Sequence, residues 1–358
     1  MEGKVITFFK RIFAEKKYRT VFIICISLAV LIVVGAFAAK RYAGQKNSLV
    51  TAKKPNSADT ICLLDGQNYT KDKATRHPLA VMIENHPDAR PQSGLIDASI
   101  VYEAITEGGI TRYMAIYGPT DTKEIGPIRS ARLFFMDYVK EYDAFYAHAG
   151  GNEDAMANID AYSIKDLSHF GDYFYRDSKG QYVASEHTLY SSTDKLYEYA
   201  AIKKFDISKS SFTAMKFKPL GPVDQAGKGV EINFSSPSYK VTWSFDPATN
   251  KYSRSLAGAP HKDRTTDQQI TSRNIIIQTV ERTYQPTGSY GSSNYVFTNI
   301  GSGPATVLRD GKVINATWKK DKLESRTKFF DESNKEITMN PGNTWYEIIP
   351  PEVTPSFI

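Results

Sequence analysis

The chain has 358 residues, enough for two domains, and 41% of them are apolar, which is sufficient for a hydrophobic core. Lys and Arg number 45 and Asp and Glu 39, but residues 1–41 hold eight of the former and two of the latter, so the remaining chain carries 37 of each sign. This neutral remainder excludes a basic nucleic-acid-binding domain, and the presence of only two cysteines excludes a disulfide framework.

The first 75 residues contain the predicted membrane segment. Residues 21–39 read VFIICISLAVLIVVGAFAA, an uncharged run that would be about 28 Å long as a helix, close to the roughly 30 Å of a bilayer core. We therefore predict a transmembrane helix at 21–39, with a signal peptide as the alternative. Six basic residues precede this run and three follow it, so residues 1–20 should be a cytoplasmic tail and residues 40–75 an extracytoplasmic linker. The predicted location is the cell membrane, single-pass, with the main domains outside.

Residues 76–225 have the pattern of an α/β domain. Runs rich in β-formers predict strands over 78–85, 99–106, 110–118 and 144–151. Segments with helical spacing follow three sets of capping residues, namely Ser130, Asn152 or Asp154, and Ser192 or Thr193. Strands that alternate with helices indicate α/β layers.

Residues 226–352 have a different character and predict a β-rich domain. Many short runs with partial alternation are separated by turn formers, as in an all-β sandwich or barrel-like fold, and a tail follows at 353–358. Asp310-Gly311 between two such runs predicts a tight hairpin. We expect Trp243, Trp318 and Trp345 to be core residues. The overall fold class is thus α+β or α/β.

Three arginines form the main candidate site. Arg129 and Arg132 flank the start of the predicted helix after Ser130, and Arg112 lies on the preceding strand. A helix N-terminus attracts anions, so these arginines could hold a phosphate or carboxylate ligand. The alternative is internal pairing with acidic neighbours, for which the candidates are Glu103, Glu107, Asp121 and Glu124.

Other polar residues are candidates for the same pocket. Glu103 and Glu107 could act as acid and base, although pairing with arginine is the simpler interpretation. His148 and His187 could be general bases or structural histidines, and Asn152 could complete the pocket. Arg176 could add a fourth arginine or pair with Asp177. No phosphate-binding glycine loop or metal-binding spacing is present, so we predict no metal and no cofactor.

Several long motifs resemble a known family. ENHPDARPQSGL, VYEAITEGGITRYMAIY, IGPIRSARLFF and YDAFYAHAGGNEDA, with RDGKVINATWKK and PGNTWYEIIP near the end, are similar to both domains of the YerB-like family of bacterial envelope proteins. This resemblance covers nearly all of residues 76–350 and implies an exported two-domain protein without an assigned chemistry. Many members look lipid-anchored, whereas this chain has the run at 21–39.

A weaker resemblance is to the LytR-CpsA-Psr cell-wall transferases, which use arginines to hold a pyrophosphate and aspartates to hold Mg²⁺. Arg129 and Arg132 match that arginine-rich turn in kind. Ser130 and Thr111 stand near where the aspartates would be expected, which speaks against metal-assisted transfer.

Three functions are compatible with the sequence. The first is an envelope protein that binds an anionic, phosphate-bearing glycan or a lipid-linked ligand through the arginines. The second is a phosphoryl-linked glycopolymer transferase, and the third is a non-catalytic envelope scaffold. The expected partners are the membrane through residues 21–39, an anionic cell-wall ligand and an envelope protein, with no nucleic acid.

Overall fold

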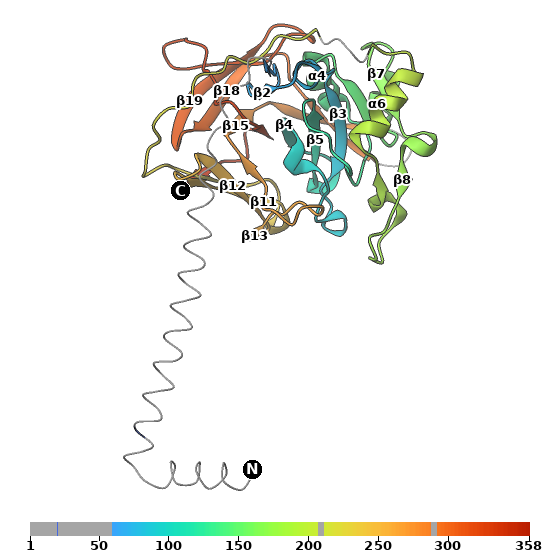
Figure 1. Cartoon of the computed structure of the whole chain (residues 1–358), viewed down its shortest axis with the longest axis horizontal. Helices are drawn as coiled ribbons and strands as arrows, with labels where there is room; N and C mark the ends of the chain where they lie inside the picture. Colours follow the sequence, from blue (N-terminus) through green and yellow to red (C-terminus); the bar gives the residue numbers. More distant parts are fainter. Residues whose placement is uncertain (1–19, 21–58, 207–210, 288–291) are drawn as a thin grey trace. The chain divides into compact units, whose positions relative to one another are not determined.

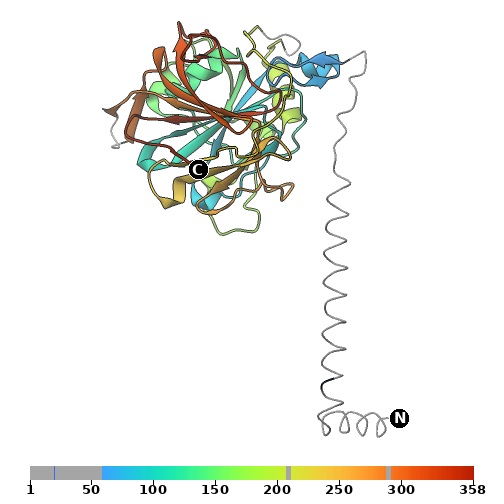
Figure 2. The same cartoon turned by 90° about the vertical axis from the view of Figure 1, so that its left-hand side faces the viewer.

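The structure is a computed structural model that describes residue 20 and residues 59–206, 211–287 and 292–358. Ser57–Ile358 forms one compact unit (Figures 1 and 2). The predicted transmembrane segment at 21–39 lies outside the described residues. Within the described part of the chain, no helix has the length and apolar character needed to cross a bilayer.

A ten-stranded mixed sheet is the centre of this unit. Its order is β20-β19-β18-β15-β21-β4-β5-β3-β6-β7. Five strands come from the N-terminal part of the chain: β3 (Leu79–Glu84), β4 (Ile100–Ile105), β5 (Thr111–Tyr117), β6 (Phe145–His148) and β7 (Lys165–Ser168). Five come from the C-terminal part: β15 (Asn274–Thr279), β18 (Gly301–Arg309), β19 (Lys312–Lys320), β20 (Lys328–Phe330) and β21 (Thr344–Ile349).

The two halves of the sheet join through one parallel pair of strands. β21 pairs with β4 so that Tyr346 lies beside Tyr102 and Glu347 beside Glu103. The prediction of two domains with mixed α and β structure is confirmed. The C-terminal part does not, however, close into a sandwich or barrel of its own, because β21 is inserted between β15 and β4 and shares its hydrogen bonds with both parts.

A second sheet and four short helices complete the fold. The second sheet contains β10 (Val230–Asn233), β11 (Lys240–Asp246), β12 (Lys251–Leu256), β13 (Ala259–Pro260), β14 (Thr271–Ser272) and β22 (Ser356–Phe357). The helices are α3 (Lys71–Ala74), α4 (Leu133–Glu141), α5 (Glu153–Ala157) and α6 (Thr193–Ile202). Three two-stranded pairs lie outside both sheets: β1 (Thr60–Ile61) with β2 (Asn68–Tyr69), β8 (Tyr175–Arg176) with β9 (Leu189–Tyr190), and β16 (Arg282–Thr287) with β17 (Ser292–Phe297).

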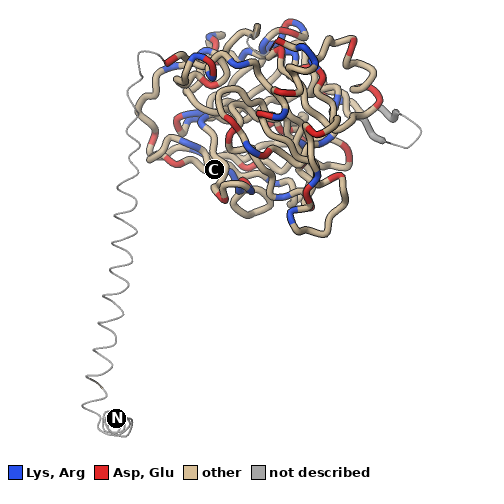
Figure 3. Tube along the Cα trace, turned by 45° about the vertical axis from the view of Figure 1, so that its right-hand side comes forward, with Lys and Arg blue, Asp and Glu red and all other residues tan. Residues whose placement is uncertain are grey.

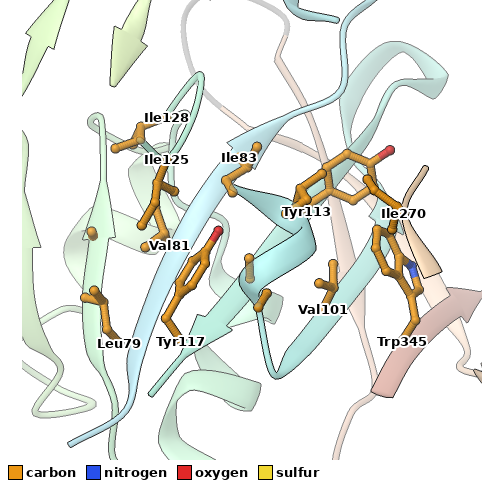
Figure 4. Close-up of a cluster of buried hydrophobic side chains, with 14 of the residues drawn as sticks. Leu79, Val81, Ile83, Val101, Tyr113, Tyr117, Ile125, Ile128, Ile270 and Trp345 are labelled. Atoms are coloured by element: carbon orange, nitrogen blue, oxygen red, sulfur yellow. The ribbon is translucent and has the colours of Figure 1, made fainter. Parts of the chain in front are cut away.

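The central sheet is covered on both faces. Successive side chains of a strand point to opposite faces, and on β5 Tyr113 and Tyr117 belong to one hydrophobic cluster whereas Met114 and Ile116 belong to the other. The first cluster also contains residues of the second sheet and of α6, and Figure 4 shows part of it around Tyr113 and Trp345. The second cluster contains the apolar residues of α4. Burial on both faces explains why β3, β4, β5 and β21 are apolar along almost their whole length.

Several local predictions are confirmed. Ser192 caps α6, and its hydroxyl accepts a hydrogen bond from the backbone N–H of Lys195 at 3.2 Å. Asp310 and Gly311 have φ angles of 53° and 71° and connect β18 to β19, as expected for a two-residue hairpin turn. The three tryptophans are all buried.

Two boundary predictions are wrong. The linker predicted to extend to Thr75 ends earlier, because Cys62 and Leu64 are buried beside β1 and α3. The predicted tail at 353–358 contains β22, which pairs with β10. In both places a short polar sequence is held by contacts with distant residues, and these contacts leave no local pattern.

The helix expected after Ser130 begins later. Its N-cap is Arg132, and α4 starts at Leu133. The residues before it run beside β3, where the N–H of Arg129 donates to the carbonyl of Met82 at 3.0 Å and the N–H of Glu84 donates to Pro127 at 2.9 Å. Pairing with β3 therefore holds this segment extended and places Arg129 next to the end of that strand.

Candidate functional site: an arginine cluster and the adjoining pocket

Glu107 is the residue around which two of the predicted arginines gather. It begins the turn between β4 and β5, in which Gly108 and Gly109 have φ angles of 66° and 73° that favour glycine. Its Oε1 accepts a hydrogen bond from Arg112 Nη2 at 3.0 Å, and its Oε2 accepts one from Arg132 Nε at 2.9 Å. Arg132 Nη2 also donates to Oε1, which makes the second pair bidentate.

Burial gives this cluster its electrostatic character. The Arg112 side chain is 4% exposed, and its Nη1 donates to the carbonyl of Ser130 at 2.9 Å. Burial, followed by the charge of Arg132, lowers the pKa of Arg112 to about 10. Burial alone would raise the pKa of Glu107, but the charges of Arg112 and Arg132 outweigh it and bring that pKa down to about 2. The carboxylate of Glu107 is therefore the internal counter-ion of two arginines.

Arg129 belongs to a neighbouring ion-pair chain. Its Nε lies 3.1 Å from Glu84 Oε1, and its Nη2 donates to Glu186 at 2.8 Å. Glu84 is buried and also contacts His187 Nδ1 at 2.8 Å through its other oxygen. His187 thus contacts the arginine region through the carboxylate of Glu84, and it does not line the pocket beside Glu107.

The three arginines are therefore close together but already paired with carboxylates. This is the internal-pairing alternative, with Glu107, Glu84 and Glu186 as partners. The other acidic residues that the sequence suggested pair with different bases: Asp121 with Lys73 and Arg76, Glu124 with Lys179, and Glu103 with Arg254. Basic and acidic residues are interspersed along the folded unit (Figure 3).

Two candidate residues lie in the core instead of a pocket. Glu103 is fully buried, where it accepts hydrogen bonds from Thr111 and Asn85 in addition to its pairing with Arg254. His148 is also fully buried, with Nδ1 2.7 Å from the carbonyl of Gly150 and Nε2 2.8 Å from Asp166. Since neither side chain is accessible and both ring nitrogens of the histidine are engaged, the predictions of Glu103 as a ligand contact and His148 as a general base are wrong.

Arg176 does not join the arginine cluster. It is exposed on β8, and its Nη1 donates to the carbonyl of Ser185. Asp177, its predicted ion-pair partner, contacts Lys179 at 2.9 Å. The sequence placed Arg176 on an extended segment but could not show which way that segment faces.

A pocket of about 120 Å³ adjoins Glu107 and Arg132. It lies between the β4–β5 turn, the first turns of α4 and α5, and β17. Its lining includes charged, amide and aromatic side chains: Glu107, Arg132, Phe134, Asp137, Asn152, Asp154, Tyr162, Tyr295 and Phe297. Asn152, as predicted, caps α5 by accepting from the N–H of Ala155 at 3.3 Å, and it also reaches this pocket.

Asp137 is an acidic residue of the pocket that the sequence did not single out. Asp137 Oδ2 accepts from Asn299 Nδ2 at 2.9 Å, and burial raises the pKa of Asp137 to about 6. Its position in the middle of α4 resembles that of an ordinary exposed helix residue, so no local signal marks it. Glu84 has a clearer signal in the sequence than Asp137, because it is a charged residue at the end of an otherwise apolar strand.

Thr111 and Ser130, which stand where the cell-wall transferases would have aspartates, have structural roles in this chain. The Thr111 hydroxyl donates to Glu103 at 2.6 Å, and the Ser130 carbonyl accepts from Arg112. Neither residue supplies a carboxylate near the arginines. Positions 111 and 130 therefore do not supply the aspartates that the transferase resemblance implied for Mg²⁺.

The fold and site define a two-part α+β protein with a shared mixed sheet and a small polar pocket beside neutralised arginines. Residues 64–207 match the N-terminal domain, and residues 230–346 the C-terminal domain, of the family described as "Protein of unknown function (DUF3048)". The chain belongs to this YerB-like family.

Two relatives share most of its length. The protein described as "Putative lipoprotein YerB" from Bacillus subtilis (strain 168) is 28% identical over 313 residues, which cover 86% of this chain and 90% of that protein. A crystal structure of YerB protein from Bacillus subtilis has a TM-score of 0.73 at 26% identity and covers 83% of this chain and 99% of that chain. The resemblance found in the sequence motifs is thus confirmed.

Proposed function

We propose that this chain is a membrane-anchored cell-envelope protein whose folded unit binds a glycan on the extracytoplasmic side. Two observations support the anchor and the location. The uncharged run at 21–39 is flanked more heavily by basic residues on its N-terminal side, and the Bacillus subtilis relative is described as a lipoprotein. The pocket beside Glu107 is the site that we assign to the ligand.

The lining of the pocket is the observation that carries the glycan assignment. Carboxylates accept hydrogen bonds from sugar hydroxyls and an amide can both accept and donate them, while aromatic rings pack against the apolar face of a sugar ring. Asp137 and Asn152 supply the first kind of contact, and Tyr162 and Tyr295 supply the second. Phe134 and Phe297 pack with ring centroids 4.4 Å apart and give the pocket an apolar wall.

The charge of the pocket favours a neutral sugar over a phosphate group. Its arginine, Arg132, is already paired with Glu107, and Asp137 and Asp154 line the same space. An added phosphate would meet carboxylates at short range, which is unfavourable. A phosphate-bearing polymer would then be held through its sugar units.

The test is a titration of the Ser57–Ile358 unit with a β-1,4-linked N-acetylglucosamine tetrasaccharide and, separately, with sodium pyrophosphate. We expect the sugar to raise the melting temperature by mass action and pyrophosphate to leave it unchanged. Tyr162→Ala should abolish the sugar-induced rise, whereas Tyr182→Ala, at a fully exposed tyrosine outside the pocket, should retain it. A rise with pyrophosphate alone, or an equal sugar effect in Tyr162→Ala, would contradict the proposal.

A non-catalytic scaffold is the second candidate, and one observation favours it. Arg112, Arg129 and Arg132 are each paired with a carboxylate of the same chain, so these charges also serve the fold. The titration separates the two functions, since a scaffold needs no response to sugar or phosphate. Partner proteins of the envelope would then be found by crosslinking through exposed surface residues.

A further inference from the structure

A second group of polar side chains lies away from the pocket, where the end of β3 meets the segment before β9. His86 follows β3 and precedes a short turn of 3₁₀ helix (Pro87–Ala89), and His187 ends another (Ser185–His187). One ligand atom from each of His86, Asp88 and His187 lies within 4.8 Å of the others. The two imidazole rings are stacked, with centroids 4.8 Å apart and planes 10° apart.

We propose that His86, Asp88 and His187 form a binding site for a divalent transition metal, with Zn²⁺ as the reference ion. Two imidazoles and one carboxylate are a ligand set that such ions accept, whereas Mg²⁺ and Ca²⁺ prefer oxygen ligands. Three protein ligands leave one tetrahedral position for water or another small ligand. None of the three residues lines the pocket beside Glu107, so this site is separate from the proposed glycan site.

The orientation of His187 is the strongest support for this site. The side chain is 8% exposed, and its Nδ1 lies 2.8 Å from a carboxylate oxygen of Glu84. A carboxylate accepts hydrogen bonds, so in the neutral imidazole Nδ1 carries the proton and Nε2 keeps its lone pair. Metal-binding histidines commonly use this carboxylate–histidine arrangement. Glu84 is itself fixed by Arg129 at 3.1 Å, which makes Glu84 and Arg129 positioning residues.

The other two ligands can complete the site by small movements. In a tetrahedral zinc site the ligand atoms lie about 3.4 Å apart, and the present 4.8 Å spread exceeds this. The side chains of His86 and Asp88 are 33% and 58% exposed, and His86 Nδ1 is 3.6 Å from an oxygen of Asp88. Metal binding would require these two surface side chains to rotate toward the fixed His187, and His86 would coordinate through Nε2 or give up the hydrogen bond that its Nδ1 accepts from the Asp88 N–H at 3.3 Å.

Calorimetric titration of the Ser57–Ile358 unit with ZnCl₂ tests the site. We expect one Zn²⁺ per chain, and His86→Ala and Asp88→Ala should each weaken binding at least tenfold. His169→Ala is the matched control, because His169 is exposed and lies outside the cluster, and it should bind as the unaltered chain does. MgCl₂ should give no saturable heat.

Binding of Co²⁺ provides a spectroscopic readout of metal coordination. This readout would not change on replacing a residue whose role is only structural. A site with two imidazoles and few ligands should give visible absorption bands when Co²⁺ binds, and these bands should be lost in His86→Ala and in Asp88→Ala. His187→Ala should lose them too, and if that variant does not fold, the two surface variants decide. Absence of Zn²⁺ binding in the unaltered chain would overturn the proposal. So would Zn²⁺ binding by His86→Ala and Asp88→Ala that is as tight as that of the unaltered chain.

Discussion

At the scale of single residues, Glu107 is the counter-ion of two of the arginines predicted from sequence. It compensates Arg112, which is buried, and Arg132, which lines the pocket. Removing one partner of a buried ion pair leaves an uncompensated charge, and this usually costs more than the pair contributes. The stability of the β4–β5 turn should thus depend on this carboxylate.

Glu107→Gln is expected to lower the free energy of unfolding by about 1–3 kcal/mol at neutral pH, because buried Arg112 loses its counter-ion, although solvent screens the 35%-exposed carboxylate. Urea denaturation measures this loss. Since the folded-state pKa of Glu107 is about 2, below the usual 4.5, its stabilisation is present above pH 4.5 and is lost as the pH falls toward 2. The variant should lack this acid-dependent contribution.

The matched control is Glu186→Gln, which removes the 53%-exposed partner of Arg129. Exposed ion pairs contribute roughly 0–1 kcal/mol, because water and salt screen them. Equal losses in the two variants would show that Glu107 has no special role, and the pairing would then be an ordinary surface contact.

At the scale of secondary-structure elements, a buried polar network connects the two sheets. Arg254 of β12 is fully buried, pairs with Glu103 of β4, and lies over the ring of Trp345 of β21 at 4.7 Å. Glu347 of β21 accepts from the indole N–H of Trp243 at 2.6 Å. Burial, followed by the charge of Glu103, raises the pKa of Glu347 well above its usual range.

Arg254→Met should destabilise the folded unit by about 3–5 kcal/mol, because Glu103 would remain as a buried charge without its arginine. Thermal and urea unfolding would both report this change. The double variant Arg254→Met, Glu103→Gln should recover part of the loss, as coupled partners do in a double-mutant cycle.

Lys262→Met is the control for the element-scale prediction. Lys262 pairs with Asp267, whose side chain is 84% exposed, so the change should stay within about 0.5 kcal/mol. If Arg254→Met were as mild as this control, the network between the sheets would not be a determinant of stability.

At the scale of the whole molecule, the two family segments share one sheet. In the order of the sheet, β4 is the last strand of the first segment, and β21 of the second segment pairs with it in parallel. A segment without its neighbour would expose the apolar faces and the unpaired edge of β4, which is an aggregation hazard. We therefore expect the two matched domains to need each other for folding.

A fragment of residues 57–227 is expected not to unfold cooperatively, because its central strand β4 loses β21 and its Tyr113 face loses the second sheet. Circular dichroism melting and NMR dispersion would measure this. The intact Ser57–Ile358 unit is the reference, and adding a 228–358 fragment should restore a cooperative transition. A sharp melt of the isolated 57–227 fragment, close to that of the reference, would refute the shared-sheet requirement.

The sequence alone determined the local features of this protein. Apolar runs marked the strands, Ser192 and Asn152 marked two helix starts, Asp310-Gly311 marked a hairpin, and the motifs identified the family. These signals are local because propensity, capping and turn chemistry act over a few residues. The gathering of Arg112 and Arg132 near one helix start was also visible.

Only the tertiary structure decided how the charges are paired and which segments share a sheet. Glu107, and not Glu103, compensates Arg112, because alternate residues around the β4–β5 turn face different surroundings. The insertion of β21 beside β4 joins residues about 240 positions apart, and His187 reaches Glu84 from 103 positions away. Such contacts depend on long-range burial and pairing, which no short stretch of sequence encodes.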